Sequence, residues 1–407
     1  MALKSQKPYS IFQRALDLNL KPNISRSRII VSELRKVIIF RERKLYAAII
    51  IAGLSIAILI FSALIISQGV LFSFEKPQLK WRYRTKGAVI SSPIIVNGIL
   101  YIGSSDGHLY SLNASNGILI WSYRTNGSIL SSPTYWSGAI YFGSHDYGLY
   151  ALNASNGRPL WIFKAYNRIG SSPLVYRGII YFGSWDNYVY ALNASDGRKI
   201  WEYYAGDIVD GSPSAHDDMI FIGSLRHRGL RRLGAIHALN ATSGELIWIF
   251  EVGDEVSTLH PAIWNGIVYF GSWDGKVYAV RVKDGVKVWT YSTKGHITAS
   301  APRISDEILY IGSCDHSVYA LDARTGDLIW RYETGGPVQS TPCIHDGVVY
   351  IGSADGNLYA LNAKTGEKLW NYTVGGAINS SPCIHGNLIY FGSNDGYVYA
   401  LEINRSA

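Results

Sequence analysis

Residues 352–370 read Gly-Ser-Ala-Asp-Gly-Asn-Leu-Tyr-Ala-Leu-Asn-Ala-Lys-Thr-Gly-Glu-Lys-Leu-Trp, and close variants of this stretch recur through nearly all of the chain after residue 80. The tryptophan that closes each copy returns at intervals of about 40 residues, at Trp81, Trp121, Trp161, Trp201, Trp248, Trp289, Trp330 and Trp370. A repeat of this length indicates copies of one supersecondary unit that pack against one another.

Each unit alternates short apolar runs with turn residues. The stretch 340–372 contains one complete unit, in which turns at 346–347, 354–356 and 362–366 separate four runs. The runs are aromatic or β-branched, and Asn, Asp or Gly stands where a tight turn needs a positive φ, so the pattern predicts four antiparallel strands. Because such a unit is apolar on both faces, the units must pack face to face around an axis.

The ends of the repeat give the number of units. Seven complete units run from 87 to 374, and an eighth begins at Gly376 but ends near 401 without its tryptophan strand. A matching strand stands alone at 79–84. The sequence therefore predicts an all-β fold, an eight-bladed β-propeller over 78–403 with four-stranded antiparallel blades, whose last blade is closed by the N-terminal strand so that no edge is left free.

The shared motif, Gly-Ser-x-Asp-Gly-x-Leu-Tyr-Ala-Leu-Asn-Ala-x-x-Gly-x-x-x-Trp, resembles the repeat of the pyrroloquinoline-quinone-type (PQQ-like) β-propeller family over roughly residues 78–403. That family is similar in fold to quinoprotein alcohol dehydrogenases and to the non-catalytic propeller lipoprotein of outer-membrane barrel assembly. The resemblance implies the fold, while the function has to be argued from the site.

Positive charge is concentrated at the N-terminus. Residues 1–45 hold 11 Lys or Arg and three acids, and the net charge of the whole chain is +8, so the remainder is neutral overall. A neutral propeller gives no argument for nucleic-acid binding. Residues 1–44 are predicted to be a basic cytoplasmic tail, and 404–407 a short C-terminal tail.

No charged residue occurs between 45 and 74, and the apolar run is long enough to cross a bilayer as a helix. It predicts one transmembrane helix over 45–70, followed by a linker over 71–77. Because the basic flank precedes the helix, we expect a single-pass protein of the cell membrane with a cytoplasmic N-terminus and an extracytoplasmic propeller. A cleaved signal peptide is the alternative, which the 44 preceding residues disfavour.

The three cysteines are predicted to be free, buried thiols. Cys343 and Cys383 occupy the same position in neighbouring units, which is too wide a separation for a disulfide, and Cys314 has no partner nearby in the repeat. Candidate acceptors for N-glycans on the extracytoplasmic side are Asn113, Asn126, Asn153, Asn193, Asn240, Asn371 and Asn379. Four of them lie in the Asn-Ala-Ser/Thr turn of the repeat, where turn formation alone explains the Asn.

The carboxylates of the Gly-Ser-x-Asp motif are interpreted as structural and not as metal ligands. Each is expected to accept backbone N–H groups in its own turn, and neighbours lie a blade width apart, which is too far to share one ion. They are Asp106, Asp146, Asp186, Asp274, Asp315, Asp355 and Asp395.

The family resemblance raises the question of a quinone cofactor. In the enzymes it implies a vicinal Cys-Cys disulfide over the quinone, a Trp beneath it, a calcium held by Glu, Asn and Asp, and a catalytic Asp. This chain has no adjacent cysteines and lacks long blade insertions. We therefore expect no cofactor, and keep pyrroloquinoline quinone with calcium, in the axial funnel near His260, as the alternative.

The fourth unit departs most from the repeat. It is seven residues longer than its neighbours, and the Asp turn is replaced by a loop that contains Arg226, His227, Arg228, Arg231 and Arg232. Loops that depart from a rigid scaffold are common binding sites, so the basic loop favours an anionic partner. A tolerated insertion is the alternative.

Four further departures concern aromatic and charged residues. Trp185 and Trp273 fill the variable position of Gly-Ser-x-Asp, whereas Trp136 and Trp264 stand in turns of the opposite face. His260 replaces a Ser on the strand that lines the axis, and Arg303 places a charge where other units have mainly apolar or small residues. Exposed Trp favours a ligand or a contact, and a lone His is also compatible with a structural role.

These observations favour a non-enzymatic, membrane-anchored extracytoplasmic propeller that acts as a binding or scaffold module for a protein or a cell-surface carbohydrate. The predicted partner-binding residues are Arg226, Arg228, Arg231, Arg232, Trp185, Trp273 and His260. The alternatives are a quinoprotein-like oxidoreductase and an envelope protein assembly scaffold.

Overall fold

The computed structural model describes residues 76–228, 231–256 and 260–403, without the side chains of 226–232. The predictions for the cytoplasmic tail, the transmembrane helix, all but the last two residues of the linker, and the C-terminal tail lie outside the described residues. Within the described residues every regular element is a strand, and none is a helix that could span a membrane.

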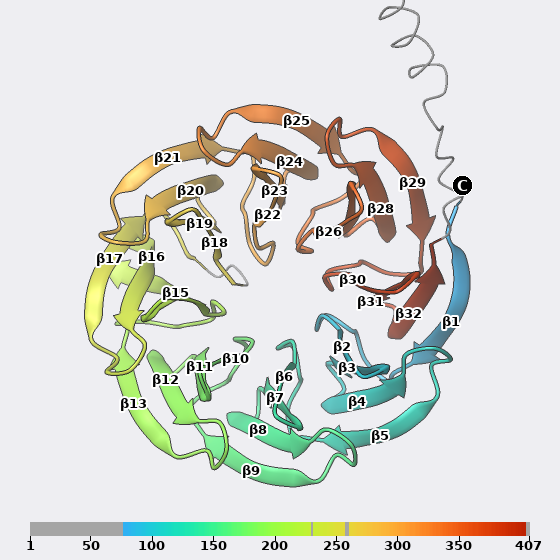
Figure 1. Cartoon of the computed structure of the whole chain (residues 1–407), viewed down its shortest axis with the longest axis horizontal. Coiled ribbons are helices and arrows are strands. Elements are labelled where there is room, and N and C mark those ends of the chain that lie inside the picture. The colour runs from blue at the N-terminus through green and yellow to red at the C-terminus, as the bar shows by residue number, and fades with distance from the viewer. Residues whose placement is uncertain (1–75, 229–230, 257–259, 404–407) are drawn as a thin grey trace, which may run out of the picture. The chain divides into compact units, whose positions relative to one another are not determined.

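Eight four-stranded antiparallel sheets are arranged around a central axis, as predicted (Figure 1). The innermost strands are β2 (Ile94–Val96), β6 (Thr134–Trp136), β10 (Leu174–Tyr176), β14 (Ser214–His216), β18 (Ala262–Trp264), β22 (Arg303–Ser305), β26 (Cys343–His345) and β30 (Cys383–His385). The second strands are β3 (Ile99–Gly103), β7 (Ala139–Gly143), β11 (Ile179–Gly183), β15 (Met219–Arg228), β19 (Ile267–Gly271), β23 (Ile308–Ser313), β27 (Val348–Gly352) and β31 (Leu388–Gly392).

The third strands are β4 (His108–Asn113), β8 (Gly148–Asn153), β12 (Tyr188–Asn193), β16 (Arg231–Asn240), β20 (Lys276–Arg281), β24 (Ser317–Asp322), β28 (Asn357–Asn362) and β32 (Tyr397–Glu402). The outermost strands are β5 (Leu119–Arg124), β9 (Pro159–Lys164), β13 (Lys199–Tyr204), β17 (Leu246–Val252), β21 (Lys287–Ser292), β25 (Leu328–Glu333), β29 (Lys368–Thr373) and β1 (Gln78–Arg84). We number the blades 1 to 8 from β2 onwards.

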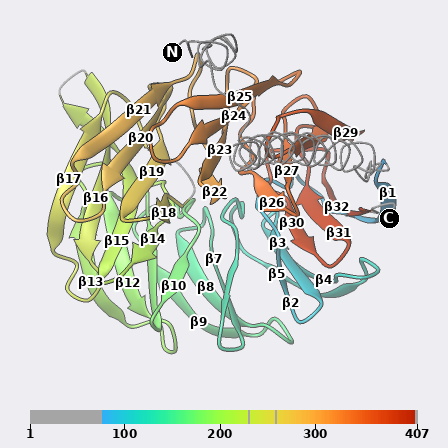
Figure 2. The same cartoon turned by 45° about the horizontal axis from the view of Figure 1, so that its top comes forward.

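The N-terminal strand completes the last blade. The sheet order of blade 8 is β1-β32-β31-β30, and β1 pairs antiparallel with β32, with Trp81 opposite Ala400 (Figures 1 and 2). Thr85 N donates to Gly396 O at 2.8 Å just beyond the strand. The two ends of the repeat are thereby joined in one sheet, which confirms the predicted closure.

The hydrophobic core lies between blades. Each of eight buried clusters joins residues of two adjacent blades, as Tyr101 and Leu109 of blade 1 pack with Ile140 and Phe142 of blade 2. The second and third strands of each blade are almost entirely buried because both of their faces meet a neighbouring sheet. A single blade would therefore expose most of the surface that stabilises it, which explains why the units form a closed ring.

The repeated tryptophan fastens each blade to the next. At the junction of blades 8 and 1, Trp81 Nε1 donates to Ala114 O at 2.9 Å, and Tyr390 OH donates to the same oxygen at 3.1 Å. Gly117 has φ +72° and lies against the indole, where a Cβ would come within 2.6 Å of Trp81 Cδ2. The Gly-x-x-x-Trp spacing of the motif thus places a Gly under the Trp of the preceding blade.

Blade 4 differs from the prediction of an inserted loop. The extra residues extend β15 and β16 to ten residues each, and their pairing continues to Arg228 opposite Arg231. The alternating apolar residues 219–225 and 233–239 start a ladder that the inserted residues continue, so the departure is a long β-hairpin and not an irregular loop.

Candidate functional site

The propeller has two faces with different turns. One face, here called the Asp-turn face, carries the turns between second and third strands, such as 104–107, and the crossings between blades, such as 85–93. The opposite Asn-turn face carries the turns between third and outer strands, such as 113–117. The β15–β16 hairpin of blade 4 belongs to the Asp-turn face.

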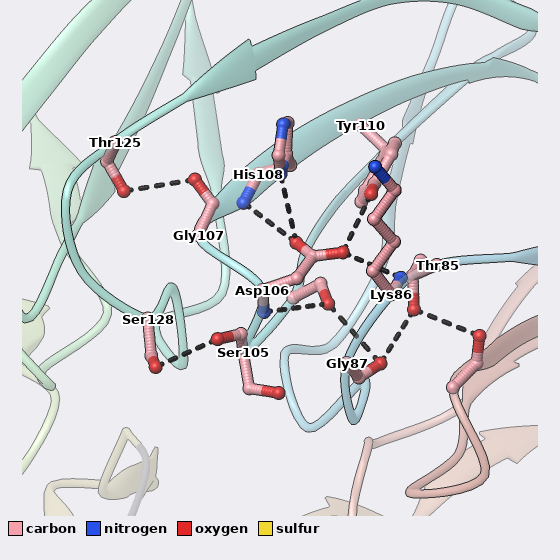
Figure 3. Close-up of polar contacts among 12 residues, drawn as sticks. Thr85, Lys86, Gly87, Ser105, Asp106, Gly107, His108, Tyr110, Thr125 and Ser128 are labelled. Carbon is pink, nitrogen blue, oxygen red and sulfur yellow. Dashed lines mark hydrogen bonds and ion pairs between the residues drawn. The ribbon is translucent and has the colours of Figure 1, made fainter.

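The motif aspartates hold the Asp-turn face together (Figure 3). Asp106 accepts hydrogen bonds from the backbone N–H of Lys86 at 2.8 Å, from the N–H of His108 at 2.9 Å, and from Tyr110 OH at 2.8 Å. Burial alone would raise the pKa of this carboxyl, but the three hydrogen bonds outweigh it and lower the pKa below its usual value. The carboxylate therefore links its own turn to the crossing from the preceding blade.

The hydrogen bond from the Tyr four residues later, at 2.6–2.9 Å, recurs in the other blades that carry the motif. No group of three or more His, Cys, Asp or Glu able to hold a metal occurs among the described residues. The aspartates thus accept hydrogen bonds from backbone and tyrosine donors, except that Oδ1 of Asp315 is buried without a hydrogen-bond partner among the described residues.

Blade 4 has lost both partners of this pair. Its hairpin replaces the Asp turn, and His237 stands where the other blades have the Tyr. His237 Nε2 lies 2.9 Å from Ser224 Oγ, and Nδ1 lies 3.3 Å from Tyr203 OH. In blade 4, which lacks the Asp, His237 therefore replaces the Tyr and contacts Ser224 and Tyr203 instead of an Asp.

A cluster on the Asp-turn face joins blades 2, 3 and 4. Trp185 Nε1 donates to Asp210 Oδ1 at 2.7 Å, the guanidinium carbon of Arg168 lies 5.5 Å from the Trp185 ring centroid, and the His145 ring lies 5.9 Å from it. Burial raises the pKa of the Asp210 carboxyl, although the Trp185 hydrogen bond opposes this. A Cβ at Gly170 would overlap that carboxylate, so the small residue is part of the arrangement.

Sequence reasoning singled out Trp185 in this cluster and missed its partners. The signal was present, because Gly170 and Asp210 occupy the repeat position at which blades 1 and 2 have Ile90 and Leu130. Burial lowers the pKa of His145, and Arg168 adds to this effect.

Trp273 lies on the same face in blade 5, on the other side of the hairpin from Trp185. Its backbone oxygen is bonded to His296 Nδ1, and the two rings are 6.0 Å apart. Both tryptophans are half-buried. Side chains of the predicted binding residues Arg226, Arg228, Arg231 and Arg232 lie outside the described residues, although their backbones place them on the hairpin.

A ring of hydroxyl groups surrounds the axis. The backbone N–H of one blade donates to the Ser or Thr oxygen of the next at 2.9–3.0 Å, through Ser92, Ser132, Ser172 and Ser212 and again through Ala301, Thr341, Ser381 and Ser92. These hydroxyls explain the recurrence of Ser-Ser-Pro: they bridge blades. In blades 5 and 6 the hydroxyl residue is replaced by His260 and Ala301.

His260 lies on the axis and away from the two tryptophans. Its Nδ1 is 2.8 Å from Pro213 O, and because a carbonyl only accepts, the proton is on Nδ1. Burial lowers the pKa of this imidazole, so it is neutral at neutral pH. The structure therefore places His260 and the tryptophans of the predicted set in two separate regions.

The axial cavity has a volume of about 500 Å³. Its described lining consists of Ser92, Pro93, Ile94, Ser132, Pro133, Thr134, Pro173, Leu174, His260, Ala301, Arg303, Thr341, Cys343, Ser381, Pro382, Cys383 and Ile384. No carboxylate belongs to this lining. A second hollow of about 470 Å³ shares Leu174, His260 and Arg303 with it and reaches Trp264.

The cysteines are free, as predicted, but they are partly and not fully buried. Cys343 and Cys383 line the axial cavity on adjacent blades, and burial raises the pKa of both thiols, that of Cys383 to about 11. Cys314 lies elsewhere, with Thr298 Oγ1 3.7 Å from its sulfur. Burial therefore favours the protonated, less reactive form of both cavity thiols.

The candidate glycan acceptors in the repeat turn also have a structural use. Asn113, Asn153, Asn193 and Asn240 each accept a backbone N–H two residues later at 2.8–3.0 Å through Oδ1. Asn379 differs, because its Oδ1 is buried without a hydrogen-bond partner among the described residues.

The family model described as "Outer membrane protein assembly factor BamB" matches residues 67–144, 127–224 and 206–406. The chain belongs to this family. The matched segments cover the propeller almost completely, and the model is built of PQQ-type repeats, as the motif indicated. A comparison with curated proteins found no significant match.

Solved structures with the same fold belong to proteins of several kinds. The computationally designed Ika8 protein has 15% identity and a TM-score of 0.70, covering 81% of this chain and 100% of its own. BamB from Moraxella catarrhalis has 18% identity and a TM-score of 0.67, with 80% and 100% covered. Quinohemoprotein alcohol dehydrogenase from Comamonas testosteroni has 15% identity and a TM-score of 0.70, with 81% and 77% covered. Likeness at these identities shows the fold alone.

The quinone and calcium of such dehydrogenases do not fit the axial cavity. Calcium prefers several carboxylate or amide oxygens, and the described lining supplies neither kind of side chain. The chain also has no adjacent cysteines. We therefore derive no catalytic step through a quinone.

Proposed function

We propose that the chain is a non-enzymatic scaffold of the cell envelope, anchored in the membrane, that binds a protein partner through the Asp-turn face around blade 4. The membership of the envelope assembly-factor family supports a scaffold. The observation that carries the proposal is the β15–β16 hairpin, the one second–third strand pair in the described residues whose strands reach ten residues.

The hairpin of blade 4 departs from the repeat, and the short turns of the other blades show that the fold forms without such an extension. The other seven blades close this turn with an Asp and a Tyr, and blade 4 has given up both for the longer hairpin and His237. The tip adds Arg226, Arg228, Arg231 and Arg232, so an acidic protein surface is the expected complement.

A protein partner is better supported than a carbohydrate. Sugars stack on a free indole face, but Arg168 covers the Trp185 ring and Asp210 holds its Nε1. An indole held in this way is a rigid part of a surface and suits a protein interface, in which Trp and Arg are enriched.

Restoring the repeat in blade 4 tests the proposal. Replacement of residues 225–233 by Trp-Asp, together with His237→Tyr, gives blade 4 the turn and the Asp–Tyr pair of blade 5. We expect this variant to fold and to lose at least tenfold in partner recovery when the tagged full chain is purified from solubilised membranes. Recovery is measured by quantitative mass spectrometry of the co-purified proteins.

The matched control is Ala354→Trp, which writes the same Gly-Ser-Trp-Asp sequence into blade 7. It should retain full recovery. If the blade 4 variant and the wild type recover equal amounts of partner, and circular dichroism shows both proteins to be folded, the hairpin is not part of the interface.

A further inference from the structure

The axial cavity contains an unpaired cation. Arg303 lies at the start of β22, and no hydrogen bond or ion pair to its guanidinium occurs among the described residues. The residue is exposed to the solvent that fills the cavity, although protein groups crowd around its guanidinium. Desolvation by these groups lowers the pKa of the guanidinium, which Cys343 partly opposes, and an arginine still remains protonated at neutral pH.

Nothing in the lining neutralises that charge. His260 is neutral, the thiols of Cys343 and Cys383 are protonated, and the described lining contains no Asp or Glu. A guanidinium without an acceptor partner in the described lining is available to pair with an anion. A guanidinium presents a fork of N–H donors that matches a carboxylate.

The apolar walls of the cavity indicate the chemistry of the remainder of the ligand. Seven apolar side chains line the same cavity: Pro93, Pro133, Pro173, Pro382, Ile94, Leu174 and Ile384. A volume of about 500 Å³ lies within the range of small-molecule sites, which combine apolar walls with a few polar groups. One guanidinium and apolar walls together fit a ligand with one carboxylate and an apolar body.

We infer that the axial cavity is a binding site for a small organic monocarboxylate, whose carboxylate pairs with Arg303 and whose apolar part packs against the proline-rich wall. Thr341 and His260 line the same space and are the polar residues nearest in kind to hydrogen-bond partners for a carboxylate. The inference does not depend on the proposed partner face, because the cavity and the hairpin share no residue.

Titration calorimetry on the purified full chain tests this with benzoate, with benzyl alcohol as the neutral analogue, and with inorganic phosphate as a bare anion. We expect one benzoate per chain, with benzyl alcohol and phosphate each bound at least tenfold more weakly. Arg303→Gln should weaken benzoate at least tenfold, Arg303→Lys should retain most of the affinity, and Arg124→Gln, on the exposed outer strand β5, should change nothing.

Thiol alkylation gives a second readout at the site. Benzoate should slow the modification of Cys343 and Cys383, which line the cavity, and leave Cys314 unchanged. Undiminished benzoate binding by Arg303→Gln, no benzoate binding at millimolar concentration, or equal binding of phosphate would each overturn the inference. A loss of benzoate binding leaves the partner proposal standing, because partner recovery is measured separately.

Discussion

Gly117→Ala should destabilise the propeller by about 2–4 kcal/mol, whereas Gly98→Ala in the same blade should cost only about 1 kcal/mol. Both glycines have a positive φ, +72° and +75°, so both alanines adopt the same strained backbone conformation. They differ in surroundings: a Cβ at Gly98 meets nothing within 4 Å, while at Gly117 it meets the Trp81 indole at 2.6 Å. The difference isolates the contact that fastens blade 8 to blade 1.

The measurement is the free energy of unfolding in urea for the wild type and both variants. Because the same Gly–Trp contact recurs around the wheel, Gly366→Ala beside Trp330 should behave like Gly117→Ala. Equal losses of unfolding free energy for Gly117→Ala and Gly98→Ala would contradict this prediction. They would show that the Trp81 indole can move aside freely and that the Gly–Trp contact does not stabilise the junction.

Asp355→Ala should destabilise the propeller by about 2–3 kcal/mol. It leaves the N–H of Gly335, the N–H of Asn357 and the hydroxyl of Tyr359 without their acceptor, which lies 2.6–2.8 Å away in the native protein. Asp355→Asn keeps one acceptor oxygen and should cost less. Unfolding midpoints in urea at pH 7 measure both losses.

The pH dependence of the Asp355 variants follows from its pKa. Burial alone would raise that pKa, but the hydrogen bonds lower it below the ordinary 3.8, so this carboxylate contributes stability at pH values above 3.8. The contribution is lost as the pH falls through the lowered pKa. The gap in stability between wild type and Asp355→Asn should therefore be constant from pH 7 to 5 and narrow below pH 4. A gap that widens on acidification would contradict this assignment.

The repeat made the fold predictable. The regular recurrence of Trp and of the Gly-Ser-x-Asp turn predicts the same contacts between each pair of blades. Counting the repeats therefore predicts the number of blades and the strand that closes blade 8. The structure shows which contacts these are. The Trp81 indole donates to Ala114 O of the next blade and packs on Gly117, and the Asp106 carboxylate accepts hydrogen bonds from Lys86 N and Tyr110 OH.

The candidate sites were harder to predict because they join unlike residues of different units. Asp210 reaches Trp185 across a blade boundary, with Gly170 making room, and the unit that holds Gly170 and Trp185 does not contain Asp210. Arg303 was noticed as an irregularity, but the absence of a partner for its guanidinium among the described residues depends on how the blades assemble around the axis. The basic insertion was correctly located, but the prediction of a loop was wrong, because the insertion forms a β-hairpin. Its strand pairing continues the hydrogen-bonded pairing of β15 with β16, which the inserted residues alone do not reveal.

The most direct test of the scaffold function maps the bound partner onto the two faces. A photo-crosslinking residue at His227 or Trp273 reports on the Asp-turn face, and one at the exposed Asn116 or Lys364 reports on the Asn-turn face. Crosslinking in intact membranes should join the same partner protein to the first two positions and not to the second two. Crosslinks from Asn116 and Lys364 alone, or at equal yield from all four positions, would contradict a partner held at blade 4.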